Sequence, residues 1–137
     1  MGQKVDELSD AEMIDTIYYT LYPNFHPWGG LYTLITYRFR PAGDDHERSI
    51  METMLLTPTA GKPTAGAPIH WLSDDEDWLA APELGLLGRI LQQDMVNLEQ
   101  LHRGLRSTRR KVIPLADYQE LKVRHFYALY RQDMGFT

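Results

Sequence analysis

Two segments in the first half of this chain are rich in β-branched and aromatic residues, which is typical of strands. They are residues 31–40, LYTLITYRFR, and residues 49–57, SIMETMLLT. A polar connector, PAGDDHER, separates them, so we expect the two strands to form an antiparallel hairpin. Residues 58–68 are mainly Pro, Gly, Thr and Ala, and this composition predicts a loop.

The segment before the first of these strands is less regular. Ser9 and Glu12 have the spacing of a capping box, which predicts a short helix that begins there. Residues 17–21 either extend that helix or start a strand, and the sequence leaves both open. Residues 23–30, PNFHPWGG, contain two prolines and a glycine pair, so we expect a structured turn rather than a helix or strand.

The second half of the chain predicts helices. The SDDE run at residues 73–76 repeats the capping-box pattern and predicts a helical turn over residues 74–79. A long helix is expected from about Pro82 to about Arg103, with Gly104 in the left-handed conformation that ends many helices.

A last helix is expected from residue 116 or 117 to about residue 134. Strands come first and long helices last, which predicts an α+β fold in which an antiparallel sheet packs on long C-terminal helices. The sequence has no internal repeat and no clear boundary, so we expect residues 1–137 to form a single domain.

Asp94 occupies an unusual position on the long helix, because a helical wheel places it at the centre of the apolar stripe. Six leucine or isoleucine residues lie within about 60° of it: Leu87, Ile90, Leu91, Leu98, Leu101 and Leu105. Asn97 lies on the same side of the helix, one turn further on. An unpaired carboxylate among apolar side chains is costly, so Asp94 is expected to have a partner.

Three interpretations of Asp94 remain open at this point. In the first interpretation Asp94 accepts hydrogen bonds from a neighbouring loop, or pairs with Arg38 or Arg40 of the strand. Alternatively, Asp94 is a ligand of a divalent cation, with Asn97 behind it as a supporting residue. In the third interpretation Asp94 is a general base in an apolar pocket.

Composition narrows the chemistry that this chain can perform. A net charge of −5 argues against nucleic acid as the main partner. The basic cluster after the long helix is explained by the helix dipole; it consists of Arg103, Arg106, Arg109, Arg110 and Lys111. There is no cysteine, so this chain cannot bind an iron–sulfur cluster through its own thiolates. Neither a signal-peptide pattern nor a membrane-length apolar run occurs, and we expect a cytoplasmic protein that does not bind membranes.

Four motifs together resemble a known family of enzymes. PNFHPWGG, YRFRPAG, QDMVNLEQLHRGL and YQELKVRHF are similar to segments in the C-terminal half of the catalytic domain of Rieske-type aromatic-ring-hydroxylating dioxygenase α (large) subunits. The resemblance extends from about Leu21 to Leu129. Its most specific part is the Gln-Asp-x-x-Asn run that begins at Gln93 and continues to Gly104-Leu105.

This resemblance implies a helix-grip (Bet v 1-like) fold, in which a curved antiparallel sheet wraps around a long helix. It makes Asp94 the candidate carboxylate ligand of a mononuclear iron(II) held by two His and one carboxylate, and Asn97 a candidate supporting residue. Such a site leaves positions open for dioxygen beside an aromatic substrate. The pocket for this substrate is then expected to include Phe25, Trp28, Leu87, Ile90 and Leu91.

The sequence also departs from the family. The family's Asp-x-x-His-x-x-x-x-His segment is missing, and the Cys-x-His and Cys-x-x-His motifs of the Rieske domain are absent. His102 cannot share a metal with Asp94, because it lies about 12 Å further along a straight helix. His26 and His125 are expected to be hydrogen-bonded core groups, and His46 and His70 to lie in loops.

We therefore expect this chain to be part of a ring-hydroxylating oxygenase α subunit, inactive alone. It is either a fragment of such a subunit or one half of a split subunit, in which a partner chain would supply the His ligands and the Rieske centre. The chain is also expected to form homo-oligomers. In an alternative interpretation it is a helix-grip-like module that binds an apolar small molecule without catalysis.

Overall fold

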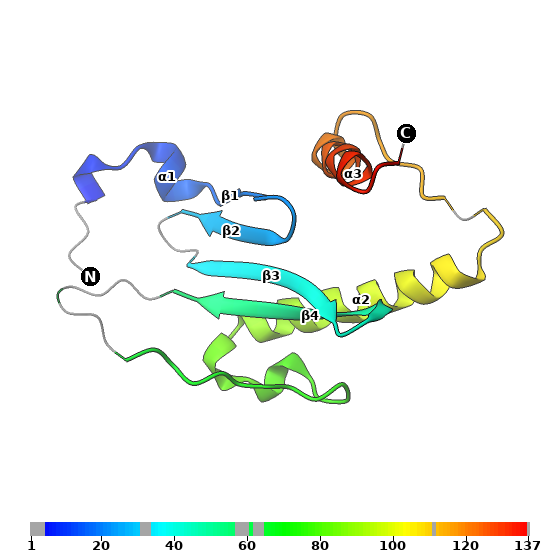
Figure 1. Cartoon of the computed structure of the whole chain (residues 1–137). Helices are drawn as coiled ribbons and strands as arrows, with labels where there is room; N and C mark the ends of the chain where they lie inside the picture. The colour runs from blue at the N-terminus through cyan, green and yellow to red at the C-terminus, as the bar shows by residue number, and fades with distance from the viewer. Residues whose placement is uncertain (1–4, 31–33, 57–60, 62–64, 111, 137) are drawn as a thin grey trace. The chain divides into compact units, whose positions relative to one another are not determined.

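The computed structural model describes residues 5–30, 34–56, 61, 65–110 and 112–136. Contacts divide the chain into two compact units, which are Met1–Thr64 with Asp117–Thr137, and Ala65–Ala116. The first unit contains a four-stranded antiparallel sheet and the second contains the long helix (Figure 1). The predicted α+β class is therefore confirmed. Packing of the sheet around the long helix, as in a helix-grip fold, stays a prediction.

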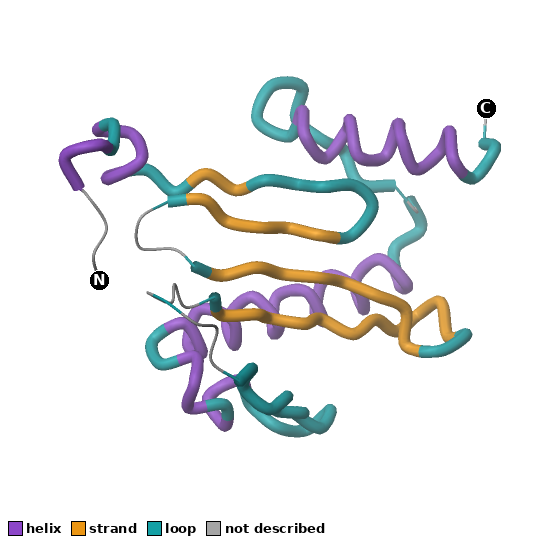
Figure 2. The backbone as a smooth tube through the Cα atoms, turned by 60° about the vertical axis from the view of Figure 1, so that its left-hand side comes forward, coloured by secondary structure: helices purple, strands orange, loops and turns teal. Residues whose placement is uncertain are grey.

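The sheet has the strand order β1-β2-β3-β4, and every neighbouring pair is antiparallel (Figure 2). The strands are β1 (Ile17–Tyr18), β2 (Phe25–Gly29), β3 (Ile35–Ala42) and β4 (Asp45–Leu55). The strand at residues 17–18 resolves the choice that the sequence left open. Because consecutive strands are neighbours, the sheet is a simple meander with β4 at one edge and the very short β1 at the other.

The predicted N-terminal cap is confirmed. A short 3₁₀ helix, η1 (Val5–Glu7), precedes α1 (Asp10–Ile14). The Ser9 hydroxyl accepts a hydrogen bond from the Glu12 N–H, and the Glu12 carboxylate accepts one from the Ser9 N–H at 2.9 Å. The Ser9 N–H and the Ser9 hydroxyl both donate to the Glu12 carboxylate, and these two hydrogen bonds lower the pKa of Glu12. Two orphan N–H groups at the start of the helix are satisfied in this way.

The prediction of an irregular turn over residues 23–30 is wrong, because Phe25–Gly29 is a strand. Pro27 is tolerated because its missing N–H does not face β3. The Phe39 N–H donates to Asn24 O, so His26, rather than Pro27, belongs to a hydrogen-bonded pair with β3. Pro27 faces β1 instead, and its carbonyl accepts a hydrogen bond from the Tyr19 N–H at 3.0 Å.

The predicted hairpin is confirmed, but its connector is shorter than expected. β4 begins at Asp45, because Ala42 pairs with Asp45 and the turn contains only Gly43 and Asp44. Gly43 has φ 65°, which favours glycine in a tight turn. The register shifts after Pro41, which pairs with Ser49, so residues 46–48 form a bulge against β3. Residues 31–33 and 57 of the expected strands lie outside the described residues, as does part of the expected loop at 58–68.

Helix α3 (Leu121–Asp133) ends where expected but begins about one turn late. It belongs to the same unit as the sheet, and Tyr22 links the two. The Tyr22 and Phe126 rings lie 5.6 Å apart, and a hydrogen bond to Asp133 raises the pKa of Tyr22. His125 is exposed on α3, so its expected place in the core is wrong.

In the second unit two 3₁₀ turns, η2 (Trp78–Ala80) and η3 (Pro82–Leu84), precede the long helix α2 (Leu87–Ser107). The helical turn expected over residues 74–79 is mostly wrong, although the Ser73 N–H does donate to Glu76 at 2.8 Å. The 3₁₀ helix begins only at Trp78, whose N–H donates to the Gln92 side chain at 2.9 Å. This bond ties η2 to α2.

The expected bounds of the long helix are also wrong at both ends. Gly85 has φ 52° and ψ −127°, a conformation that stops η3 and delays the helix until Leu87. At the other end Gly104 is helical, and the helix continues to Ser107. Arg103 and Arg106 therefore lie inside the helix, and Arg103 pairs with Glu99 one turn earlier at 3.4 Å. Lys111 lies outside the described residues.

Candidate functional site

Helix α2 has two different faces within its own unit. On one face Leu91 is only 2% exposed, and a Cβ added to Gly88 would lie 3.2 Å from the Trp78 carbonyl of η2. The packing of η2 against α2 explains this close approach. On a helical wheel of α2, Leu91 lies about 60° from Asp94, at the edge of the apolar stripe nearest the face that packs against η2.

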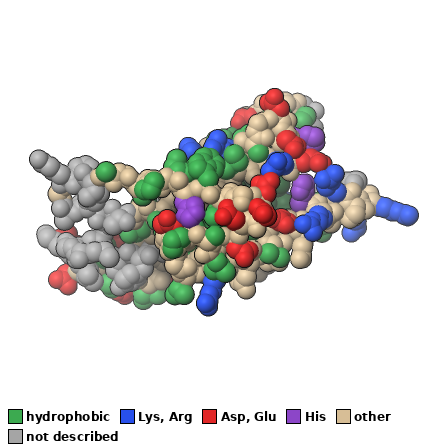
Figure 3. All heavy atoms as spheres, turned by 90° about the horizontal axis from the view of Figure 1, so that it is seen from below, with side chains coloured by type: hydrophobic (Ala, Val, Ile, Leu, Met, Phe, Trp, Pro, Cys, Tyr) green, Lys and Arg blue, Asp and Glu red, His purple; other side chains and the backbone are tan. Residues whose placement is uncertain are grey.

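Much of the rest of the apolar stripe is exposed, although Leu87 and Leu105 are half-buried. Ile90 is 54% exposed, Leu98 49% and Leu101 53%. Apolar side chains also reach the surface at several places on the face drawn in Figure 3. Asp94 lies among these exposed apolar residues and is itself exposed. A carboxylate at this position remains hydrated. The apolar stripe predicted a free-energy cost for burying Asp94, but in this structure the residue is not buried and there is no such cost.

Asp94 makes no hydrogen bond or ion pair within the described part of the chain. Asn97, its expected supporting residue, is exposed one turn further along α2. Arg38 and Arg40, which the sequence offered as partners of Asp94, instead donate from their Nε atoms to Glu52 of β4. The hydrogen bond from Arg38 is the main cause of a lowered pKa for Glu52. The position of Asp94 thus leaves its carboxylate available to an external group.

The described residues do not complete a metal site. No three His, Asp or Glu side chains among them come together in a way that could hold a metal ion. The donor set that the family resemblance implies needs two histidines beside Asp94. Of the histidines in this unit, His70 instead contacts Glu83 through Nδ1 at 3.2 Å, and His102 is exposed on α2. Asp94 is thus an exposed carboxylate without such histidines beside it, and the residues described here do not fit a whole iron site.

The expected pocket residues fall in both units. Phe25 and Trp28 lie on β2, whereas Leu87, Ile90 and Leu91 lie on α2. On β2 the two aromatic residues are three positions apart, so their side chains leave opposite faces of the sheet. Leu91 is buried, and Leu87 and Trp28 are half-buried. Assignment of these five residues to one pocket stays a prediction.

Trp28 belongs to an aromatic cluster that the sequence analysis missed. Tyr18 lies opposite Trp28 with ring centroids 5.2 Å apart, and it also stacks on His26 at 5.7 Å. Trp28 contacts Tyr37, and His26 contacts Phe39, both edge to face. These five residues share one face of the sheet (the aromatic face) because they alternate along three adjacent strands. The alternation of Tyr37 and Phe39 in YRFR was a usable signal, but assigning PNFHPWGG to a turn hid its other half.

Three polar atoms on the same side of the sheet as the aromatic face are buried without a hydrogen-bond partner among the described residues. They are His26 Nδ1, Trp28 Nε1 and Thr53 Oγ1. Burial lowers the pKa of His26 and raises that of Tyr18. Both shifts favour neutral side chains, so this face is apolar and uncharged near neutral pH.

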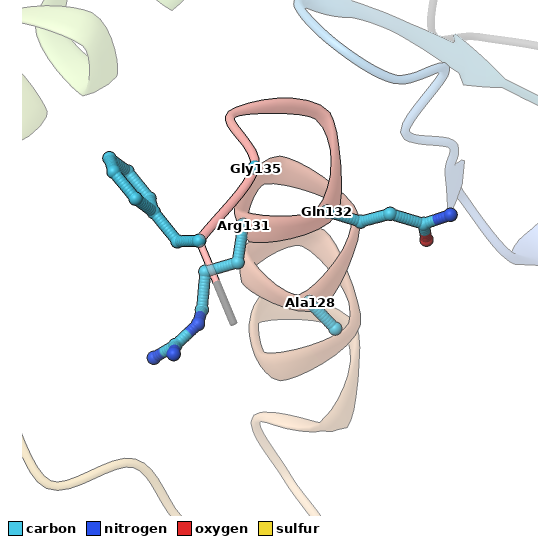
Figure 4. A pocket seen from close by; sticks show the side chains of 5 residues that line it. Ala128, Arg131, Gln132 and Gly135 are labelled. Carbon is cyan, nitrogen blue, oxygen red and sulfur yellow. The ribbon is translucent and has the colours of Figure 1, made fainter.

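Two hollows formed by described residues do not coincide with the expected pocket. One lies at the C-terminal end of α3, where Arg131 and Gln132 extend in different directions around an open depression (Figure 4). The other lies beside the β3–β4 turn and includes Arg40 and His46. Neither contains Asp94 or Trp28. Among the described residues, no helix is long and apolar enough to cross a membrane.

Comparison with protein-family models gave one match that covers nearly the whole chain. The model describes the ring hydroxylating alpha subunit (catalytic domain), and it matches residues 2–135. Comparisons with curated proteins and with solved structures gave no significant match.

Proposed function

Because this chain belongs to the family of ring-hydroxylating α-subunit catalytic domains, we propose that it contributes one part of the active site of such an oxygenase. Its contribution is the carboxylate of Asp94, as one ligand of a mononuclear iron(II), together with part of the pocket for an aromatic substrate. The observation that carries this proposal is the exposed Asp94 without an ion-pair partner among described residues, within the motif most specific to the family.

The remaining ligands come from outside the described residues. The two histidines are supplied by a further segment of the same polypeptide or by a partner chain, and so is the Rieske centre, because this sequence contains no cysteine to hold one. The chain alone then binds iron weakly and does not hydroxylate substrate. In this proposal Asn97, one turn from Asp94 on α2, supports the ligand by a hydrogen bond.

Reconstitution tests this proposal. The full chain is mixed with the upstream catalytic segment of a ring-hydroxylating α subunit, which carries the Asp-x-x-His-x-x-x-x-His spacing and the Rieske domain, and with iron(II). Dioxygen and a reductant for the Rieske centre are added, and hydroxylation of naphthalene is then measured. Asp94→Ala is expected to reduce the rate by more than the roughly 10- to 100-fold that loss of a supporting group costs.

The control for this substitution is Glu99→Ala. Glu99 is an exposed carboxylate on the same helix, it pairs with Arg103, and it lies on a different face from Asp94. The Glu99 variant should retain the rate of the unmodified chain. Equal rates for the Asp94 variant and the unmodified chain would rule out the proposed ligand role.

The alternative function, binding of an apolar small molecule without catalysis, has one observation in its favour. The aromatic face of the sheet is uncharged and lies wholly on β1, β2 and β3 of one unit. Calorimetric titration of the full chain with naphthalene, with and without iron(II), separates the two functions. If the affinity for naphthalene is the same with and without iron(II), and the same in Asp94→Ala, the result supports binding without catalysis.

A further inference from the structure

Helix α3 is attached to the sheet through the turn that joins β1 and β2. The helix and the sheet belong to the same compact unit, and α3 lies beside this turn in Figure 1 and in Figure 2 alike. Among the described residues, no helix or strand has more than a slight contact with α3. The turn contacts the helix through Tyr22, whose ring lies 5.6 Å from the ring of Phe126.

The burial pattern of α3 identifies the face that is attached. Of the 13 residues in this helix, only Phe126 and Leu129 are not exposed. Asp133 follows them by seven and four positions, and residues with these spacings share one face of a helix. The Tyr22 hydroxyl donates a hydrogen bond to Asp133. Tyr22 therefore contacts this face twice, with its ring at Phe126 and with its hydroxyl at Asp133.

Without this contact α3 has little to stabilise it. Helices shorter than about 12–15 residues are marginal in water when isolated, and α3 has 13 residues. No side-chain hydrogen bond caps its first turn. Large apolar side chains on its other faces are exposed, among them Leu121 at 60% and Tyr127 at 52%. We therefore expect α3 to unfold when it leaves the sheet.

Tyr22 is also part of the turn that leads into β2. Leu21 and Phe25 close this turn with two backbone hydrogen bonds, of 2.8 and 3.1 Å. Asn24 connects the turn to β3, because its carbonyl accepts a hydrogen bond from the Phe39 N–H at 3.1 Å. A movement of Tyr22 thus acts on the end of β2 at which the aromatic face begins.

We propose that Tyr22 is a latch that holds α3 on the sheet, and that α3 detaches and unfolds as one segment when this contact opens. Opening exposes Phe126 and Leu129, and it frees the turn between Leu21 and Asn24. The start of β2 is then less well ordered, so the attachment of α3 controls one end of the aromatic face. This inference does not depend on the proposed function, because it involves neither iron nor Asp94.

Amide hydrogen exchange of the full chain tests this inference. Tyr22→Phe keeps the ring beside Phe126 and removes only the hydroxyl. We expect at least threefold faster exchange at the amides of α3, such as the Arg124 N–H, which donates to Glu120 O at 3.0 Å. The amides that pair β3 with β4 should exchange as in the unmodified chain.

Two results of this experiment would overturn the inference. Unchanged exchange throughout α3 would show that the hydroxyl of Tyr22 does not hold the helix. Equal acceleration in α3 and in the β3–β4 pair would show that the helix and the sheet open together. The control is Tyr127→Phe, which removes an exposed hydroxyl from α3 itself and should leave the exchange rates unchanged.

A double-mutant cycle tests the pairing of Tyr22 with Asp133. Asp133→Ala removes the acceptor, but it also removes a negative charge from the C-terminal end of a helix, where such a charge is unfavourable. The cycle with Tyr22→Phe separates the two effects, because the charge effect is the same in both backgrounds. Asp133→Ala should accelerate exchange in α3 at least threefold more with Tyr22 present than with Phe at that position. Equal effects in the two backgrounds would contradict the latch.

The Phe39 amide reports on the start of β2, because it is bonded to Asn24 O. Tyr22→Ala removes both the ring and the hydroxyl, and it should accelerate exchange at Phe39 at least threefold together with α3. Faster exchange in α3 but not at Phe39 would overturn the control of the aromatic face by α3. Circular dichroism checks that Tyr22→Ala folds, and if it does not, the Phe39 amide in Tyr22→Phe decides.

Discussion

Leu91 and Asp94 lie three residues apart on α2, yet Leu91 is 2% exposed and Asp94 is exposed. The helix packs η2 against the side that carries Gly88 and Leu91, and leaves the side that carries Asp94 open. The same helix therefore has one face that stabilises its own unit and one face that is available to a ligand or a partner.

The buried face predicts a large effect of truncation at Leu91. Leu91→Ala should lower the free energy of unfolding by about 2–4 kcal/mol, because it removes a fully buried side chain and leaves a cavity. The control, Leu98→Ala, changes the same residue type where it is 49% exposed, and should cost less than about 1 kcal/mol. Urea denaturation measures both. Equal costs would contradict the assignment of the two faces.

Two glycines on α2 allow a matched test of the contact with η2. Gly104→Ala meets nothing within 4 Å and should stabilise the helix by about 0.5–1 kcal/mol. At Gly88 the new Cβ would lie 3.2 Å from the Trp78 carbonyl. Gly88→Ala should therefore stabilise the protein less than Gly104→Ala does, or destabilise it. The melting temperatures of the two variants provide the comparison. A larger gain at Gly88 would show that η2 does not pack there.

The sequence predicted those parts of the fold that depend on local composition. The capping box at Ser9, the hairpin and the end of the last helix are confirmed, because each has a short-range signal. β2 was missed because the position of Pro27 is acceptable only in the particular register that turns its missing N–H away from β3. That register depends on pairing between distant residues and cannot be read from the segment alone.

In the candidate site, too, local patterns were predicted from the sequence and contacts between distant residues were not. The wheel placed Asp94 and Leu91 on one stripe, but it could not show that η2 covers only the Leu91 side. Similarly, Glu52 was not expected to engage Arg38 and Arg40, since strand register decides which charged residues lie together. The role of Asp94 came from the motif rather than from the geometry.

The Glu52 cluster predicts a pH dependence in the acid range. Hydrogen bonds from Arg38 first, and then Arg40, lower the pKa of Glu52 in the folded state. The unfolded chain therefore takes up a proton at Glu52 before the folded chain does. The stabilisation is present above about pH 4.3, the ordinary value for glutamate, and is lost as the pH falls through the lower folded pKa.

Glu52→Gln removes this titration. The melting temperature of the variant should therefore fall less steeply below about pH 4.3 than that of the unmodified chain. If Glu52→Gln leaves the slope unchanged, the cluster does not form in solution.

His26 predicts a second pH dependence, nearer neutrality. Burial lowers its folded pKa, so protonation favours the unfolded chain as the pH falls below about 6.5, the ordinary value for histidine. Stability should decrease through this range until the folded pKa is reached. His26→Phe keeps a ring against Tyr18 and Phe39 and should abolish this decrease. His102→Asn, at an exposed site, should preserve it.

Iron content of the reconstituted complex tests the central claim most directly. The full chain and the segment with the Asp-x-x-His-x-x-x-x-His spacing, prepared without its Rieske domain, are mixed with iron(II) under anaerobic conditions, passed through gel filtration and assayed for metal. We expect about one iron per complex for the unmodified chain and for Glu99→Ala, because a site of two histidines and one carboxylate holds a single iron. We expect little or no iron for Asp94→Ala. A full complement of iron in an intact Asp94→Ala complex would show that Asp94 is not a ligand.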